Sequence, residues 1–379
     1  MKILICTLGS AGFYNPMIGL AKALETQGHK VAFVAHHRKA LYLRLAGVMR
    51  LSVPCEGEGF TISQWINPEF GALQFKDVMS AIRDFTPDLI VTQPMVLGCI
   101  AAARYTSTPF VTVGQFTPLW QEYSWQDPGV PKALSKLRNW RARELCEFYL
   151  SLCRHLNLTD QVRDSRDLLG VLHLIRSVEP WLQERLPQGL AYAGSMLWEA
   201  GPSREVRDWL ARMQQQQRKI IYVQHGKRFF LDTFWEKLPV WSRSDEFAFA
   251  LSTGQVCPSP VEWPENVLCL PYIPQSLMFT QCSHAVLHGH TTSVLGALLQ
   301  NEKTIVLPAG GETVDNAIVC RSLGSIKVID DWSALSFDEV INHHFTPHEV
   351  NIPETARGFD LASGLICNVI KSSQLMAFN

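Results

Sequence analysis

The ten cysteines of this chain include no C-x-x-C pair and show no metal-ligand spacing. That absence excludes the common cysteine-based zinc and redox motifs and favours reduced thiols in a cytosolic protein. The chain also lacks an excess of charge of one sign, because 34 Lys and Arg stand against 35 Asp and Glu. Without a basic excess it has no general electrostatic attraction to nucleic acid or to an anionic membrane. We therefore expect neither of these partners.

Long apolar runs are missing as well. No run reaches the ~18 residues that suggest a transmembrane helix, and the first apolar stretch is broken at Gly9, too early for the core of a signal peptide. We expect a cytoplasmic protein without a membrane span. At 379 residues and 47% hydrophobic content, the chain suits a globular protein of two domains.

What the chain does have is an alternation of strand-like and helix-like segments. Residues 2–8 and 29–36 have strand character, and the helical stretch between them begins at Pro16 and ends at Gly28. A second unit of this kind spans residues 87–115. The pattern predicts α/β architecture with parallel sheets covered by helices on both faces. In such sheets, ligands bind outside the carboxyl ends of the strands.

The second half of the chain repeats this alternation after a polar stretch. The glutamine run at 214–217 has little to bury, so we predict a linker there. The predicted organisation is an N-terminal domain (1–199), a linker (200–219), a second domain (220–350) and a C-terminal segment (351–379). We expect the helix of that last segment to pack back on the N-terminal domain.

Residues 288–308, HGHTTSVLGALLQNEKTIVLP, hold the first functional signal. An apolar strand ends at Pro308, and the helix-like run before it starts at Thr291, Thr292 and Ser293. A helix N-terminus exposes unpaired N–H groups and the positive end of the helix dipole, which suits a phosphate. The stretch is therefore a candidate anion site, although most such helix starts only cap themselves.

This stretch and its neighbours resemble the donor-binding region of nucleotide-sugar-dependent glycosyltransferases with the GT-B fold. The resemblance is strongest to the UDP-glycosyltransferase-like branch that glycosylates natural products. In family order, the chain has Y-I-P-Q at 272–275, H-G-H at 288–290, A-L at 297–298, Pro308, E-T at 312–313 and N-A at 316–317. Residues 12–24, 87–93 and 222–227 resemble further family segments. The implied fold is two Rossmann-like domains facing each other across a cleft.

The resemblance also implies roles for residues of the second domain. His288 and the backbone N–H groups of Thr291, Thr292 and Ser293 would hold the diphosphate, and Tyr272 would stack on the base. The implied donor-binding set is Tyr272, Gln275, His288, Gly289, His290, Thr291, Thr292, Ser293, Glu312 and Thr313. The donor would be a UDP- or TDP-linked sugar acting as co-substrate, with a small-molecule acceptor and neither a further cofactor nor a metal. A homodimer is left open.

Several positions depart from the family pattern. Phe13 stands at the position of the family's usual catalytic base, and Gln93 at that of the acidic residue that orients the base. Gly296 stands where the family has the glutamate that binds the ribose hydroxyls. The glycine and proline of a later G-x-P element are Asn301 and Lys303. Three alternatives follow: sugar transfer with another base or an acceptor that needs none, another reaction on a nucleotide or phosphorylated substrate, or an inactive relative that binds a ligand or partner.

Histidines in loops at strand ends are the candidates for a replacement base, because imidazole titrates near neutral pH. They are His36, His37, His225 and His290, of which His37 and His225 are the leading choices for the catalytic role. The acceptor pocket is predicted to be lined by Phe13, Gln93, Gln115 and Trp120, with Trp125 nearby. The tryptophans could equally belong to the core.

Overall fold

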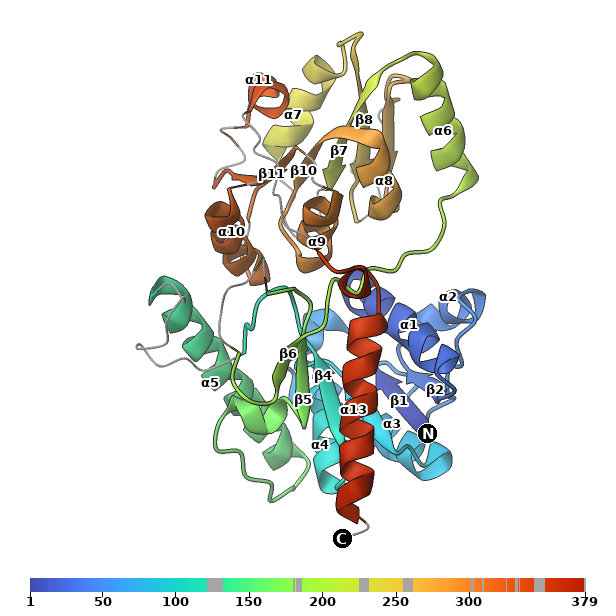
Figure 1. Cartoon of the computed structure of the whole chain (residues 1–379), viewed down its shortest axis with the longest axis vertical. Coiled ribbons are helices and arrows are strands. Elements are labelled where there is room, and N and C mark those ends of the chain that lie inside the picture. The colour runs from blue at the N-terminus through green and yellow to red at the C-terminus, as the bar shows by residue number, and fades with distance from the viewer. Residues whose placement is uncertain are drawn as a thin grey trace. The chain divides into compact units, whose positions relative to one another are not determined.

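The computed structural model describes residues 1–120, 132–179, 181, 186–224, 232–254, 262–300, 303–308, 310–324, 326–330, 333, 335–343 and 352–377 (Figure 1). The chain divides into two compact units. Unit 1 is Met1–Trp198 with Ile352–Asn379, and unit 2 is Glu199–Asn351.

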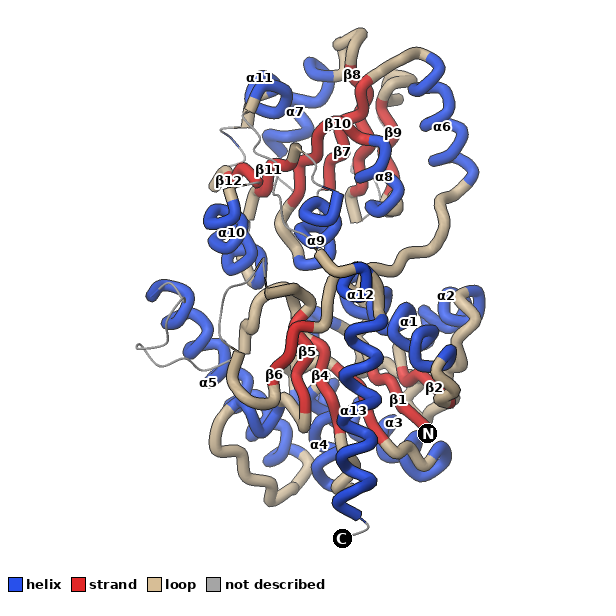
Figure 2. The backbone as a smooth tube through the Cα atoms, viewed as in Figure 1, coloured by secondary structure: helices blue, strands red, loops and turns tan. Residues whose placement is uncertain are grey.

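Unit 1 is built on one six-stranded parallel sheet with the order β2-β1-β3-β4-β5-β6 (Figure 2). Its strands are β1 (Lys2–Cys6), β2 (Lys30–Val34), β3 (Leu89–Thr92), β4 (Phe110–Val113), β5 (Leu172–Ile175) and β6 (Leu190–Tyr192). Its helices are α1 (Ala11–Thr26), α2 (Ala40–Leu45), α3 (Pro68–Phe85), α4 (Leu97–Tyr105), α5 (Lys132–His155), α12 (Glu354–Arg357) and α13 (Asp360–Ala377), with short 3₁₀ turns at His37–Lys39, Ile62–Gln64 and Ser165–Leu168. Every pairing within this sheet is parallel, as the alternating pattern predicts.

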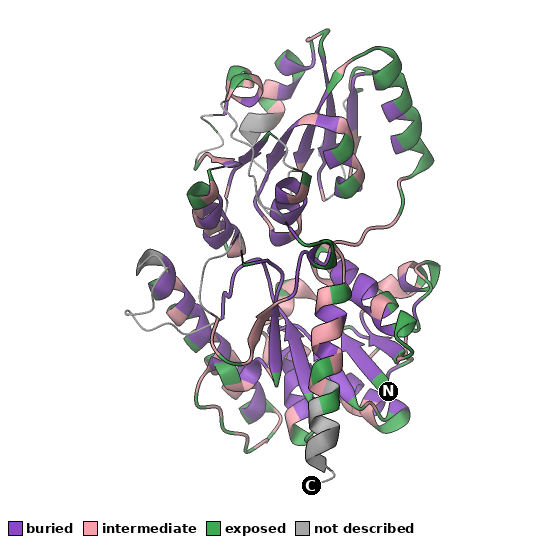
Figure 3. Cartoon of the chain, in the orientation of Figure 1, coloured by how far each residue is buried: buried purple, intermediate pink, exposed green. Residues whose placement is uncertain are grey.

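Both faces of the unit 1 sheet are buried, so its strands read as continuous apolar runs. Leu4 packs into the core on one face, and Ile3 and Ile5 pack into the core on the other. The burial colouring shows the inner strands of the sheet buried, the edge strand β6 of intermediate burial, and the exposed residues gathered on outer helix faces and loops (Figure 3). The sheet is thus a rigid support for the loops at its carboxyl edge.

Helix α1 begins at Ala11, five residues before the predicted start at Pro16. Proline has no N–H, so inside a helix it leaves the carbonyl four residues earlier without its usual partner. Here that carbonyl belongs to Gly12, and the guanidinium of Arg176 donates to it at 3.4 Å. The sequence predicts Pro16 in the first turn of the helix because it does not reveal that Arg176, from the end of β5, lies beside Gly12.

The C-terminal helix α13 packs within unit 1, against α1 and β5. The amide Nε2 of Gln27, just after α1, donates to Ser363 Oγ at 2.8 Å. The preceding segment is tied down too, because Ser195 N donates to Ala356 O at 2.9 Å. The chain end therefore completes the fold of the first unit.

Unit 2 has a second six-stranded parallel sheet with the order β12-β11-β10-β7-β8-β9. The strands are β7 (Lys219–Gln224), β8 (Phe247–Ser252), β9 (Val267–Leu270), β10 (Cys282–Leu287), β11 (Thr304–Val306) and β12 (Ile326–Val328). The helices are α6 (Arg204–Gln215), α7 (Asp232–Trp241), α8 (Gln275–Gln281), α9 (Thr291–Gln300), α10 (Glu312–Leu323) and α11 (Phe337–Asn342). If β7 is counted as the first strand, this sheet has the order 3-2-1-4-5-6, which is the Rossmann arrangement. The unit 1 sheet has the order 2-1-3-4-5-6, so both sheets are of the doubly wound α/β type.

The predicted linker 200–219 is wrong for most of its length, because α6 occupies it. The helix belongs to unit 2, and its buried residues recur at helical spacing: Val206, Trp209, Leu210 and Met213. The hydroxyl of Ser203 caps the helix by accepting from Val206 N at 3.3 Å. The glutamine run forms only the end of this helix, so its polarity was a poor guide to the residues before it.

No helix within the described parts of the chain combines the length and the apolar character needed to cross a membrane.

Candidate functional site

The loop from β10 to α9 lies at the carboxyl end of a central strand of unit 2, where ligands of such sheets bind. It turns at Gly289, whose φ of +81° is a conformation that L side chains rarely adopt. A Cβ there would lie 2.8 Å from Val306 Cγ1. The carbonyl of Gly289 accepts from Asn316 Nδ2 at 2.9 Å, so α10 holds the turn in place.

Two imidazoles flank this turn. The rings of His288 and His290 lie edge to face with centroids 4.2 Å apart. His288 is 4% exposed, and the backbone N of His290 donates to its Nδ1 at 3.5 Å. With Nδ1 accepting, Nε2 carries the proton of the neutral ring and can donate to an anion.

Glu312, the first residue of α10, reaches the start of α9. Its carboxylate accepts from His290 Nδ1 at 2.8 Å, from Thr291 Oγ1 at 2.9 Å and from Thr291 N at 3.4 Å. Burial acts to raise the pKa of the Glu312 carboxyl, but the bonds from His290 and Thr291 outweigh it and hold that pKa below its ordinary value. The resemblance places Glu312 in the donor-binding set, and the sequence gives no sign of its pairing with His290.

Other predicted donor residues take part in a network that fixes α9. Ser293 Oγ donates to Gln224 Oε1 at the end of β7, and Ser293 N donates to His290 O. Gln275 is 3% exposed and donates through Nε2 to the carbonyl of Thr292 at 2.9 Å. Thr313 is fully buried, and its hydroxyl donates a hydrogen bond to the carbonyl of Gly310 at 2.8 Å. These side chains position the loop. Gln224 also belongs to this network, although its role there is not predicted from the sequence.

Tyr272 lies just after β9 and is 41% exposed. Its hydroxyl donates to Glu199 Oε1 at 3.0 Å, and the same carboxylate accepts from the backbone N of Gln275 and of Ser276. Burial raises the pKa of Glu199, and these hydrogen bonds offset the rise only in part. One end of the tyrosine is thus held while the ring remains accessible, as stacking on a base requires. Glu199 was not found from sequence because it stands apart from every motif.

In unit 1, Gln93 ties the β1–α1 loop together. Its Nε2 donates to Thr7 Oγ1 at 2.9 Å and to the carbonyl of Phe13 at 3.2 Å, and its Oε1 accepts from Leu8 N at 3.1 Å. An amide can serve as donor and acceptor at once, which a carboxylate cannot. Gln93 therefore braces the loop that carries Phe13.

The other predicted pocket residues are largely buried. Gln115 is 5% exposed and Trp120 is 6% exposed. Trp120 belongs to a core cluster against which Phe13 packs, and its ring meets Trp65 edge to face at 5.9 Å. The structure thus brings Phe13, Gln93 and Trp120 to one region of unit 1. His225, Trp125 and Asn301 lie outside the described residues.

His37 lies in the loop after β2, at the start of a 3₁₀ turn, and its ring is close to the carboxylate of Glu58. Nδ1 of His37 lies 2.9 Å from Oε1 of Glu58, although the ring N–H is not aligned with that oxygen. His36 Nε2 lies 3.4 Å from the other carboxylate oxygen. The backbone N of Arg38 donates to His36 Nδ1 at 3.2 Å. Burial lowers the pKa of His36, and the Glu58 charge offsets this only in part.

The ligand atoms of His36, His37 and Glu58 lie within 4.8 Å of one another, a separation that a cation could bridge. A metal at His36 Nε2 would need its lone pair, yet with Nδ1 accepting from Arg38 N the proton stands on Nε2. The geometry therefore favours a histidine–carboxylate pair over a metal centre. Glu58 was missed because its loop has no periodic pattern.

No protein-family model matches the chain, and no curated protein matches its sequence. Solved structures do match. The glycosyltransferase of kitacinnamycin gives a TM-score of 0.69 at 15% identity, covering 97% of this chain and 98% of that one. SnogD, a glycosyltransferase from Streptomyces nogalater, gives 0.61 at 18% identity over 100% of both chains. The Streptomyces sp. SF2575 glycosyltransferase SsfS6, in complex with thymidine diphosphate, gives 0.57 at 17% identity, covering 86% and 87%.

At these identities the similarity establishes the fold. The two six-stranded parallel sheets with their helices are the two Rossmann-like domains of the GT-B fold, which these glycosyltransferases share. The two Rossmann-like domains expected from the sequence resemblance are therefore confirmed.

Proposed function

We propose that this protein transfers a sugar from a nucleotide-diphosphate donor, UDP- or TDP-linked, to a small-molecule acceptor of the natural-product kind. The observation that carries the proposal is the loop at the end of β10. There, a buried imidazole and the start of a ten-residue helix meet on a GT-B scaffold. Neighbours of the same fold were solved with thymidine diphosphate or DTDP, which supports a nucleotide diphosphate as the ligand class.

In this proposal, unit 2 binds the donor. The diphosphate would accept from His288 Nε2–H and from the positive end of α9, and Tyr272 would stack on the base. Negative charge develops on the diphosphate as the bond to the anomeric carbon breaks. Fixed donors aimed at that charge are among the strongest contributions to catalysis.

Unit 1 would supply the acceptor site and the base. Phe13 has no lone pair, so we assign the base to His37, the leading candidate that the structure describes. Glu58 beside Nδ1 favours the tautomer with the proton on that atom, which leaves Nε2 to accept a proton. The acceptor hydroxyl would lose its proton to Nε2, and its oxygen would form the new bond to the anomeric carbon. The diphosphate would leave with the electron pair of the broken bond.

The proposal is tested by a thermal-shift screen of the whole chain against UDP, TDP and GDP, each with and without glucose attached. A ligand at 100 times its Kd stabilises the folded state by about 2.7 kcal/mol. We expect a rise in Tm with UDP or TDP and with the corresponding sugars, followed by release of nucleoside diphosphate when an acceptor panel is added. Unchanged Tm with every ligand contradicts the proposal. Binding without transfer or hydrolysis identifies an inactive relative instead.

A further inference from the structure

The N-terminus of α9, which we assign to the diphosphate, is occupied in this structure by a carboxylate of the protein itself. The Glu312 carboxylate accepts from three donors there, namely His290 Nδ1, Thr291 Oγ1 and Thr291 N, at 2.8, 2.9 and 3.4 Å. Its side chain is only 17% exposed. A carboxylate in this position satisfies a helix N-terminus as a phosphate would.

Two further polar side chains of α10 make hydrogen bonds elsewhere. The hydroxyl of Thr313 donates to Gly310 O, and the amide of Asn316 donates to Gly289 O. An incoming diphosphate that takes the donors of α9 therefore displaces a charged group that needs new donors. Sugar hydroxyls could provide them, whereas a free nucleoside diphosphate brings only further negative charge.

We propose that Glu312, held in place by His290, is a built-in competitor of the diphosphate and makes the site prefer a nucleotide sugar to the nucleoside diphosphate product. This inference rests on the proposed donor site of unit 2. Glu312 exchanges one set of hydrogen bonds for another when the intact donor binds. With the product, it loses the first set and gains none, so the product is released more readily.

Isothermal titration calorimetry with UDP, TDP, UDP-glucose and TDP-glucose tests the inference on binding alone. Glu312→Gln keeps the shape of the side chain and removes its charge. We expect this variant to bind the nucleoside diphosphate at least about fivefold tighter, within the usual range of coupling between ligands. The nucleotide sugar should gain less or lose affinity, so that the ratio of the two affinities falls.

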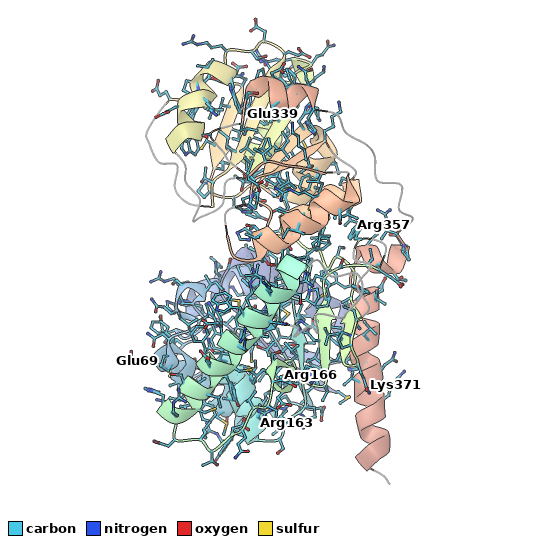
Figure 4. All side chains as sticks on the ribbon, turned by 90° about the vertical axis from the view of Figure 1, so that its left-hand side faces the viewer. Glu69, Arg163, Arg166, Glu339, Arg357 and Lys371 are labelled. Carbon is cyan, nitrogen blue, oxygen red and sulfur yellow. The ribbon has the colours of Figure 1, made fainter. Side chains whose placement is uncertain are left out.

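Two further variants sharpen the result. Glu339→Gln is the matched control. Glu339 is a carboxylate of unit 2 on α11, labelled in Figure 4, and it pairs with Lys327 Nζ at 2.8 Å rather than with the start of α9. It should change neither affinity. In a His290→Ala background the effect of Glu312→Gln should shrink, because the carboxylate has then lost its strongest partner. Far-ultraviolet circular dichroism checks that each variant is folded.

Each outcome decides between the two claims. An unchanged or weaker affinity of Glu312→Gln for UDP and TDP overturns the competitor role and leaves the proposed function standing. Equal tightening of diphosphate and nucleotide sugar overturns the preference. If neither wild type nor Glu312→Gln binds any of the four probes, the donor site itself fails, and this inference falls with it.

Discussion

The ring of Phe279 covers Gly296 so closely that a Cβ at position 296 would lie 2.5 Å from it. Phe279 is fully buried and packs edge to face on Tyr222 with ring centroids 5.7 Å apart. Position 296 is where related glycosyltransferases are expected to carry a glutamate. Here the space for that side chain is filled by an aromatic ring from α8. The packing between α8 and α9 therefore leaves room only for a glycine at position 296.

Gly296→Ala should therefore destabilise the protein by about 1–3 kcal/mol, as overpacking of a core does. Phe279→Leu should recover part of that loss in the double variant, because a smaller side chain makes room for the added methyl group. The matched control is Gly364→Ala on α13, where a Cβ would meet nothing within 4 Å. Urea denaturation gives the unfolding free energies of the three single variants and of the double variant. Equal stability of Gly296→Ala and Gly364→Ala would contradict this account of the packing.

A buried histidine in unit 1 predicts a second property, sensitivity to acid. Thr112 Oγ1 donates to Leu169 O, so it accepts from His173 Nδ1 at 2.7 Å. Burial lowers the pKa of His173 to about 3. Because the unfolded chain binds this proton near pH 6.5 and the folded chain does not, His173 costs stability as the pH falls from 6.5 toward 3.

His173→Asn should reduce the loss of unfolding free energy between pH 7 and pH 5 by up to about 1.4 kcal/mol per pH unit below 6.5. Burial also lowers the pKa of His284 to about 4, so the variant should keep part of the dependence of the unfolding free energy on pH. Replacing the exposed His155 by Asn is the control and should leave the slope as in wild type. If both variants show the wild-type slope, His173 is not a source of the acid sensitivity.

Much of the fold could be predicted because alternating β and α segments carry local signals. The two places where boundaries failed have non-local causes. Pro16 reads as a helix start unless one knows that Arg176 serves the carbonyl of Gly12. The glutamine run reads as a linker although Trp209 is buried and donates through Nε1 to Glu265 O, 56 residues away.

The same limit applies to the site. The motif residues around His288 were identifiable by their order along the chain. The pairing of Glu312 with His290 joins residues 22 positions apart on different elements. Glu58 and Glu199 lie outside every motif, and only tertiary packing places them beside His37 and Tyr272. Carboxylates that act through a partner leave little trace in a single sequence.

His37→Gln tests the assigned base. With an aliphatic alcohol as acceptor, kcat should fall by about 10²–10⁴, the usual contribution of general-base catalysis. With a thiophenol, which is ionised at neutral pH, kcat should change little. Glu58→Gln should lower kcat for the alcohol less strongly and leave the donor KM unchanged. Equal loss with both acceptors would show that His37 serves binding or structure.

Phe13→His is the complementary experiment. The amide of Gln93 is already bonded to Thr7 Oγ1, Leu8 N and the Phe13 carbonyl, so a new imidazole at position 13 finds no carboxylate to orient it. We expect no gain in kcat with the alcohol. A clear gain would mean that the chain lacks a working base and that His37 has been wrongly assigned.

The central claim is that the loop at the end of β10 binds the diphosphate of a nucleotide. Calorimetric titration of wild type and His288→Ala with TDP and UDP, and competition by thymidine and uridine, tests it most directly. The account predicts that His288→Ala weakens diphosphate binding about tenfold or more, equivalent to about 1.4 kcal/mol, while nucleoside binding changes less than about twofold. Equal loss for diphosphate and nucleoside, or no binding of either by the wild type, would contradict it.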